Sequence, residues 1–164
     1  MSASFRRAAT KIAPLESLRK ICEDARRDKR TVAFANGCFD LLHVGHTRYL
    51  QGARAEGDLL VVGINADASV RKLKGPSRPL QNEQDRALLV AALHVVDWVV
   101  VFTEDTVDKL LLALKPDVHC KGTDYTEETV PERETVRSYG GRVAIVGDPK
   151  DHNTSTFLAR LATR

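Results

Sequence analysis

The chain has 164 residues, 43% of them hydrophobic and 29% charged, with 10 Gly and 6 Pro. This length and composition fit one domain with a buried core and exclude a disordered or collagen-like chain. No apolar run approaches the roughly 20 residues of a membrane-spanning helix. The chain has 25 Lys/Arg and 22 Asp/Glu, and nine of the basic and four of the acidic residues lie in residues 1–30. Residues 31–164 therefore carry a slight net negative charge, and we do not expect this part of the chain to bind nucleic acid.

The N-terminus is basic but lacks the apolar stretch of a secretory signal peptide. The three cysteines, Cys22, Cys38 and Cys120, are an odd number and form no C-x-x-C pair. This usage is typical of free thiols in a reducing compartment, so we expect a cytoplasmic protein with neither a membrane nor a nucleic acid as partner.

The first predicted element is a helix over residues 14–27, with Pro14 in its first turn and apolar side chains at helical spacing. We divide the chain into a basic N-terminal arm and helix, residues 1–30, and a main domain, residues 31–164. Strands are predicted at 31–37, 58–66, 97–102, 117–122 and 141–147, and helices at 44–56, 82–94, 105–115, 131–139 and near 154–163. This alternation predicts a single α/β domain, with a five-stranded parallel sheet, helices on both faces and an additional N-terminal helix.

The turn between the first strand and the following helix, residues 36–46, reads NGCFDLLHVGH. His43 and His46 are three residues apart, which places both on one face of the helix's first turn. There the unpaired N–H groups and the positive end of the helix dipole favour an anion, and imidazole donors can stabilise charge that develops in phosphoryl or nucleotidyl transfer. Gly37 and Gly45 allow a nucleotide to approach the backbone closely.

Residues 71–86, RKLKGPSRPLQNEQDR, are predicted to form a polar loop because Gly and Pro disfavour a helix there. This segment follows the second strand, so we expect it on the same rim as the two histidines. A triphosphate and a sugar phosphate carry several negative charges, and clustered Lys and Arg can bind them. The cationic residues of the segment are Arg71, Lys72, Lys74, Arg78 and Arg86.

Two further residues near this rim have two interpretations each. Asp40, just before a helix, is expected as its N-cap, and it could also contact the substrate. Lys121 is either a rim lysine that reaches water or a ligand for a phosphate or sugar. His119 and Cys120 are neighbours on a strand and so point to opposite faces, which argues against a zinc site, and no metal site is predicted.

The histidine segment resembles the HxGH signature of the cytidylyltransferase-like nucleotidyltransferases. The resemblance implies a Rossmann-like fold that joins a nucleoside triphosphate to a phosphorylated small molecule and releases pyrophosphate, with His43 and His46 stabilising the transferring α-phosphate. Residues 73–79, LKGPSRP, and 117–125, DVHCKGTDY, resemble the members of that family that adenylylate D-glycero-β-D-manno-heptose 1-phosphate. The resemblance therefore implies synthesis of ADP-heptose for a bacterial lipopolysaccharide, from ATP with Mg²⁺ carried on the triphosphate.

Residue roles follow from the motifs together with this resemblance. Catalysis is assigned to His43, His46 and Lys74. Nucleotide binding is assigned to Asn36, Gly37, Cys38, Phe39, Gly45, Arg86, Lys121, Gly122, Asp124, Thr154 and Ser155, although the last two hydroxyls could equally cap the final helix. Binding of the sugar phosphate is assigned to Asp40, Asn65, Asp67, Lys72, Arg78 and Tyr125. Two departures from the family pattern, Thr123 and Asn153, allow for a variant sugar.

Two other functions stay open on the sequence. One is a cytidylyltransferase for glycerol 3-phosphate or a related alcohol phosphate, which shares the histidine motif. The other, of a different class, is a non-catalytic nucleotide-binding partner of a sugar kinase. Some relatives are fused to a kinase domain, for which 164 residues leave no room, so the sugar phosphate is expected from elsewhere. Trp98 and the N-terminal helix are candidates for a homodimer interface.

Overall fold

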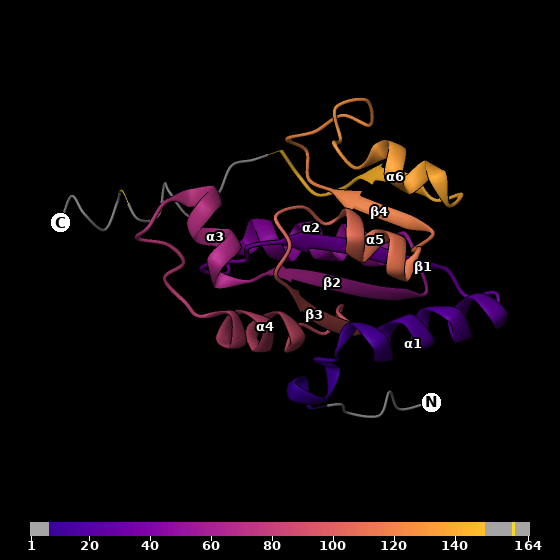
Figure 1. Cartoon of the computed structure of the whole chain (residues 1–164), viewed down its shortest axis with the longest axis horizontal. Coiled ribbons are helices and arrows are strands. Elements are labelled where there is room, and N and C mark those ends of the chain that lie inside the picture. Colours follow the sequence, from indigo (N-terminus) through magenta and orange to yellow (C-terminus); the bar gives the residue numbers. More distant parts are fainter. Residues whose placement is uncertain (1–6, 150–158, 160–164) are drawn as a thin grey trace.

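Five parallel strands form one sheet, as the apolar runs predict (Figure 1). The structure is a computed structural model that describes residues 7–149 and 159. The strands are β1 (Val32–Gly37), β2 (Leu59–Asn65), β3 (Trp98–Phe102), β4 (Val118–Lys121) and β5 (Arg142–Ile145). Their order across the sheet is β3-β2-β1-β4-β5, and every neighbouring pair is parallel. The predicted five-stranded parallel sheet is confirmed.

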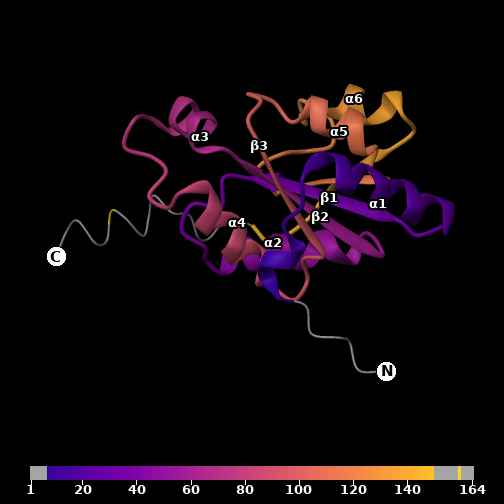
Figure 2. The ribbon, with the colours of Figure 1, turned by 60° about the horizontal axis from the view of Figure 1, so that its bottom comes forward.

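Helices cover both faces of the sheet, as predicted (Figure 2). They are η1 (Ala8–Lys11), α1 (Leu15–Arg27), α2 (Val44–Ala55), α3 (Asp67–Lys74), α4 (Glu83–Ala91), α5 (Asp108–Leu114) and α6 (Arg133–Ser138). η1, α2 and α4 pack on one face and α1, α5 and α6 on the other, whereas α3 follows the carboxyl end of β2. Among residues 7–149, no helix has the length and apolar character to cross a bilayer.

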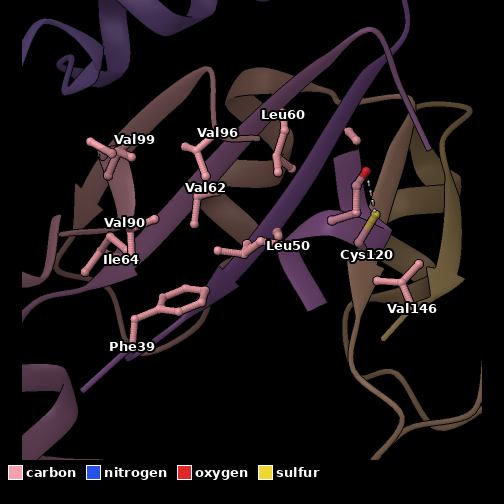
Figure 3. Packing of buried hydrophobic residues seen from close by; sticks show 14 of the residues in the cluster. Phe39, Leu50, Leu60, Val62, Ile64, Val90, Val96, Val99, Cys120 and Val146 are labelled. Atoms are coloured by element: carbon pink, nitrogen blue, oxygen red, sulfur yellow. Dashed lines mark hydrogen bonds between the residues drawn. The ribbon is translucent and has the colours of Figure 1, made fainter. Parts of the chain in front are cut away.

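Alternate side chains of each strand enter two separate apolar clusters, one on each face of the sheet. On β2, Val62 and Ile64 pack with Leu50 of α2 and Val90 of α4 (Figure 3), while Val61 packs on the opposite side. All of these side chains are fully buried, and burying each one contributes about 1.5–3 kcal/mol. Burial on both faces explains why the strands are apolar at consecutive positions.

The N-terminal helix α1 forms part of the core, and its prediction over residues 14–27 is confirmed. Leu18, Cys22 and Ala25 are fully or almost fully buried at helical spacing and face α5. The Arg26 guanidinium donates hydrogen bonds to carbonyl groups at the end of α5, including that of Leu114 at 3.3 Å. The division of the chain at residue 30 stays a prediction.

The predicted polar loop at 71–86 is wrong at its start, because α3 continues through Lys74. Gly75, with φ +99°, ends this helix in a conformation that other residues rarely adopt. Asn82 caps the next helix, so the loop comprises only residues 75–82. The Gly and Pro residues thus lie beyond the helix end and do not interrupt it. The helix predicted near 154–163 lies outside the described residues, except for Ala159.

The strand order reverses at β1. From β1 the chain adds β2 and β3 on one side, and then returns to place β4 and β5 on the other side. The loops that leave β1 and β4 therefore diverge at the carboxyl edge of the sheet. Open parallel sheets bind ligands in the crevice at such a point.

Candidate active site

A cleft of about 840 Å³ lies at this crevice. Its walls come from the end of β1 and the first turns of α2, from the ends of β2 and α3, and from the residues after β4 and β5. It brings together the following predicted site residues: Asn36, Gly37, Cys38, Phe39, His43, Gly45, His46, Asn65, Lys74, Arg78, Lys121, Gly122, Asp124 and Tyr125. Their individual roles stay predictions.

His43 and His46 form a reciprocal cap at the N-terminus of α2. Nδ1 of His43 accepts a hydrogen bond from the Gly45 N–H at 3.2 Å, and Nδ1 of His46 accepts one from the His43 N–H at 3.4 Å. The two rings stack, with centroids 3.9 Å apart and planes 29° from parallel. Their predicted position side by side on the first turn is confirmed. The prediction that Asp40 could cap this helix is wrong, because His43 is its N-cap.

These capping bonds determine which nitrogen of each ring carries the proton. An Nδ1 atom that accepts a hydrogen bond is unprotonated, so Nε2 carries the proton in both rings. Both rings line the cleft at the N-terminus of a 12-residue helix, whose dipole favours an anion. The histidine pair therefore offers the cleft two N–H donors in a fixed tautomer.

Phe39 anchors the turn that carries the histidines. Its side chain is 3% exposed and lies in the core (Figure 3), with its ring centroid 5.2 Å from that of His46. Its φ of +49° is a left-handed conformation, which an L-residue adopts only where its surroundings hold it. A Cβ atom at Gly37 would lie 3.1 Å from this ring, a tight contact that the ring would have to relieve by shifting a few tenths of an ångström.

Asp40 connects the histidine turn to the 75–82 loop. Its buried Oδ2 lies 2.7 Å from Nε and 2.6 Å from Nη2 of Arg78, and its carboxylate accepts hydrogen bonds from the N–H groups of Leu80 and Gln81. Burial alone would raise the pKa of Asp40, but these hydrogen bonds and the Arg78 charge outweigh it and lower the pKa. Asp40 does not line the cleft, so the structure makes it a clamp that positions Arg78, which does line it.

Arg86 is wholly buried and does not line the cleft. Its guanidinium donates to the carbonyl groups of Cys38 at 2.6 Å and Gln81 at 2.9 Å, and pairs with Asp67 at 2.7 Å. The structure thus places Arg86 and Asp67 in a network that joins α3 and α4 to the histidine turn. Lys72 also lies outside the cleft walls, where it pairs with the exposed Asp105 at 2.8 Å.

Lys121 ends β4 at the cleft, and its interpretation as a lysine that reaches water is wrong. Its side chain is about one-tenth exposed, and its ammonium group lies 3.3 Å from the Glu132 carboxylate. The same group lies 4.9 Å from the ring centroid of Tyr125, over its face. Lys121 is therefore a paired cation in the cleft wall, held between a carboxylate and an aromatic ring.

The sequence profile of the cytidylyltransferase-like family matches residues 34–160, which include all the described residues of the cleft wall. The chain belongs to this family. It is 54% identical over 155 residues to the bifunctional protein HldE of Syntrophotalea carbinolica, covering 94% of this chain and 32% of that one. It is 47% identical over 164 residues to the HldE of Trichlorobacter lovleyi, covering 100% of this chain and 33% of that one. The chain thus spans about a third of the length of these curated relatives.

Solved structures share the fold of this cytidylyltransferase-like chain. The lipopolysaccharide core biosynthesis protein from Thermoplasma volcanium superposes with a TM-score of 0.64 and 28% identity, over 74% of this chain and 99% of that one. Pantothenate synthetase from Thermus thermophilus superposes with a TM-score of 0.58 and 21% identity, over 87% of this chain and 63% of that one. The predicted resemblance to the cytidylyltransferase-like family and the Rossmann-like fold are confirmed.

Sequence reasoning missed several walls of the cleft in this cytidylyltransferase-like chain. Arg48 and Tyr49 line it, and with Gly45 they follow the helical spacing i, i+3 and i+4, a signal that could have found them. The Tyr49 hydroxyl donates to the Cys120 carbonyl at 2.7 Å, and burial raises the pKa of Tyr49. Asp148 lines the cleft and pairs with Arg48 at 3.2 Å. It directly follows the strand predicted at 141–147, and no sequence pattern indicated a role for it.

Within residues 7–149 and at 159, no group of three or more His, Cys, Asp or Glu side chains is arranged to hold a metal ion. His119 and Cys120 face opposite sides of the sheet, as predicted: His119 packs against Phe34, and the Cys120 thiol faces the Ala53 carbonyl. Thr154, Ser155 and the departure at Asn153 lie outside the described residues.

Proposed function

We propose that this chain is an adenylyltransferase that joins ATP to D-glycero-β-D-manno-heptose 1-phosphate, giving ADP-heptose and pyrophosphate. The histidine pair carries the proposal, because its two Nε2–H donors lie at a helix N-terminus in a cleft lined by Lys74, Arg78 and Lys121. The choice of substrate is supported by the resemblance of residues 73–79 and 117–125, and by the name of the Thermoplasma volcanium neighbour.

The proposed reaction is a direct displacement at phosphorus. A phosphate oxygen of the sugar 1-phosphate attacks the α-phosphorus of ATP, a new P–O bond forms, and the bond to the β-phosphate oxygen breaks to release pyrophosphate. The attacking phosphate is already ionised at neutral pH, so no general base is needed. Catalysis consists of positioning and of stabilising the charge that develops on the α-phosphate oxygens.

Each cleft residue has a part in this proposal. His43 and His46 donate to the α-phosphate through Nε2, and the N-terminus of α2 adds a favourable field. Lys74 stabilises the leaving phosphates, and Arg78, held by Asp40, binds the phosphate of the sugar. Gly122, where a Cβ would meet no atom within 4 Å, leaves space for the nucleotide beside Lys121.

Mg²⁺ fits this site as an ion that enters with the triphosphate, because the described residues provide no carboxylate cluster for it. Magnesium is bound well by phosphate oxygens and water, and there it neutralises charge on the leaving group. Lys74 and Arg48, which both line the cleft, would supply positive charge to the triphosphate without competing for the metal.

A screen of pyrophosphate release tests the proposal. ATP, CTP, GTP and UTP are each combined with a panel of sugar and polyol phosphates. Release with ATP and heptose 1-phosphate alone is the expected result, whereas release with CTP and glycerol 3-phosphate would establish the alternative cytidylyltransferase. No release with any pair would favour a non-catalytic nucleotide-binding partner of a sugar kinase.

We further propose a cytoplasmic location and a homodimer. Trp98 stays a candidate for the dimer interface because it is only partly buried at the start of β3. Light scattering on the purified chain gives its mass in solution, and a monomer at all concentrations would contradict the dimer.

A further inference from the structure

His119 is buried in β4, and its ring reaches the side chain of Asn36 at the end of β1. Nε2 of His119 lies 3.1 Å from Oδ1 of Asn36. His119 pairs with Phe34 in the sheet, and Asn36 lies two residues further along β1 on the same face. The imidazole is fully buried, whereas Asn36 is half-buried and lines the cleft. Nothing in the proposed transfer reaction requires His119.

The ring of His119 is neutral at physiological pH. Burial, with a further contribution from the Lys121 charge, lowers the pKa of His119 from 6.5 to about 3, and the Asp108 charge opposes this to a smaller extent. A neutral imidazole has one N–H donor and one acceptor nitrogen, so only one of the two ring nitrogens can donate.

Two arrangements of this pair of side chains are possible, and they differ in which imidazole nitrogen carries the proton and in the orientation of the Asn36 amide. In the first, Nε2–H of His119 donates to Oδ1 of Asn36. In the second, the amide is rotated and donates to Nε2, which leaves the imidazole proton on Nδ1. Nδ1 is buried and has no hydrogen-bond partner among the described residues. Either arrangement leaves Nδ1 unpaired, at a cost of about 1–3 kcal/mol. The structure has the first arrangement, because Oδ1 of Asn36, which can only accept, lies 3.1 Å from Nε2.

We propose that His119 is a positioning residue that holds the Asn36 amide with its NH₂ group toward the cleft, as a donor to a phosphate oxygen of the nucleotide. The inference rests on the proposed nucleotidyl transfer. Asn36 directly precedes Gly37, on the strand that leads into the histidine turn, and it lines the cleft. An NH₂ group can only donate, and phosphate oxygens are strong acceptors. The bond to His119 prevents the amide from rotating and presenting its oxygen to the nucleotide instead.

Steady-state kinetics of pyrophosphate release on three variants tests this role. His119→Leu removes the donor, His119→Gln keeps an amide donor, and Cys120→Ala alters the neighbouring buried residue on the opposite face. We expect His119→Leu to raise the KM for ATP about tenfold, which corresponds to about 1.4 kcal/mol, with little change in kcat or in the KM for the sugar phosphate. His119→Gln should retain most of the wild-type affinity. Cys120→Ala should lower the thermal midpoint and leave the KM for ATP unchanged.

A double-mutant cycle shows whether His119 acts through Asn36. In an Asn36→Ala background, His119→Leu should have no further effect on the KM for ATP. A folded His119→Leu protein with a wild-type KM for ATP overturns the proposal. So does an equal rise in the KM for ATP with and without the Asn36→Ala substitution, or a rise in the KM for the sugar phosphate alone.

A measurement without turnover separates this inference from the proposed function. In ¹⁵N NMR spectra of the wild-type chain, we expect His119 to show a proton on Nε2, none on Nδ1, and no titration between about pH 5 and pH 8. A neutral ring with its proton on Nδ1 and none on Nε2 overturns the positioning role. Absence of pyrophosphate release in the screen, with the Nε2–H tautomer present, would instead contradict only the transfer reaction.

Discussion

We propose two functions for each imidazole of the histidine pair, with different atoms: Nδ1 caps the helix, and Nε2 donates to the α-phosphate. An asparagine at position 43 keeps the capping function, because Asn is as good an N-cap as Ser or Asp, but it removes the Nε2–H donor. We therefore expect His43→Asn to lower kcat by about 100-fold or more while the thermal midpoint changes little. Kinetics and thermal unfolding measure the two effects separately.

The matched variant His43→Ala removes both functions. Its kcat should fall as far as that of His43→Asn. Its free energy of unfolding should also fall by about 1 kcal/mol, because the N-cap is lost. Near-normal turnover in His43→Asn would show that the imidazole donor at this position does not stabilise the transferring phosphate.

The buried carboxylate of Asp40 can be tested by substitution. Removing its buried carboxylate leaves the Arg78 charge and two backbone N–H groups without their partner. Loss of one member of such a buried pair costs about 3–5 kcal/mol, so Asp40→Ala should strongly lower the free energy of unfolding in urea. Asp148→Ala is the control, because the Asp148 side chain is 58% exposed in its ion pair with Arg48, and its loss should cost less than about 1 kcal/mol. Equal losses in the two variants would contradict the clamp.

Residue by residue, the sequence predicts chemistry better than it predicts partners. The histidine pair was predictable because its spacing is local to one helical turn. The role of Asp40 was not, since its partners lie about 40 residues away in the chain and Leu41, with φ +62°, redirects the backbone beside it. Arg86 is assigned to nucleotide binding on the sequence, but its guanidinium binds the protein's own carbonyl groups.

Among the elements, α1 offers the clearest test of packing. Leu18 is fully buried between α1 and the sheet, whereas Leu15, one turn earlier, is 37% exposed. Because the helix faces α5 and β1 through Leu18, we expect Leu18→Ala to cost about 2–5 kcal/mol of unfolding free energy. Leu15→Ala, the matched control, should cost less than about 1 kcal/mol. A small loss in Leu18→Ala would show that α1 contributes little to the core.

Strands and most helices could be predicted from the positions of their apolar residues. A strand buried on both faces is apolar at consecutive positions, and a helix buried on one face is apolar at helical spacing. The exception is α3. Its cationic second half, from Arg71 to Lys74, and the following Gly75 resemble a loop, and only Val70 and Ser69 are buried. A helix that contributes so little apolar surface leaves a weak periodic signal. Its N-terminal part is held by hydrogen bonds, from the Asp67 N–H to the Glu83 carboxylate and from the Ser69 hydroxyl to the Thr103 carbonyl.

For the molecule as a whole, alternation of strands and helices predicts a parallel sheet with right-handed crossovers, but it leaves the strand order open. The order decides where the cleft lies, because the loops after β1 and β4 diverge only when β4 is placed beside β1. The aligned edge then gathers residues from positions 36 to 149 around one cleft. The side-chain positions within that cleft depend on long-range pairs such as Asp40–Arg78 and Lys121–Glu132, which no local pattern encodes.

The stability of the whole molecule should depend on pH through the buried His119. Its pKa is lowered to about 3 in the folded chain from 6.5, so between these values the unfolded chain binds a proton at this residue that the folded chain does not. The free energy of unfolding must therefore rise with pH across this window, by up to about 1.4 kcal/mol per pH unit, and fall as the solution is acidified. Urea unfolding from about pH 6.5 down to about pH 4.5 measures this slope above the range in which Asp40 is protonated.

His119→Leu isolates this contribution, because every other titrating group is common to the two proteins. The variant should lose stability less steeply than the wild type on acidification, since leucine binds no proton in either state. Cys120→Ala, which lowers stability through packing on the opposite face, should keep the wild-type slope at a lower absolute free energy. Parallel slopes in the wild type and His119→Leu would mean that the folded chain accommodates a charged imidazole next to Lys121, and the lowered pKa of His119 would be contradicted.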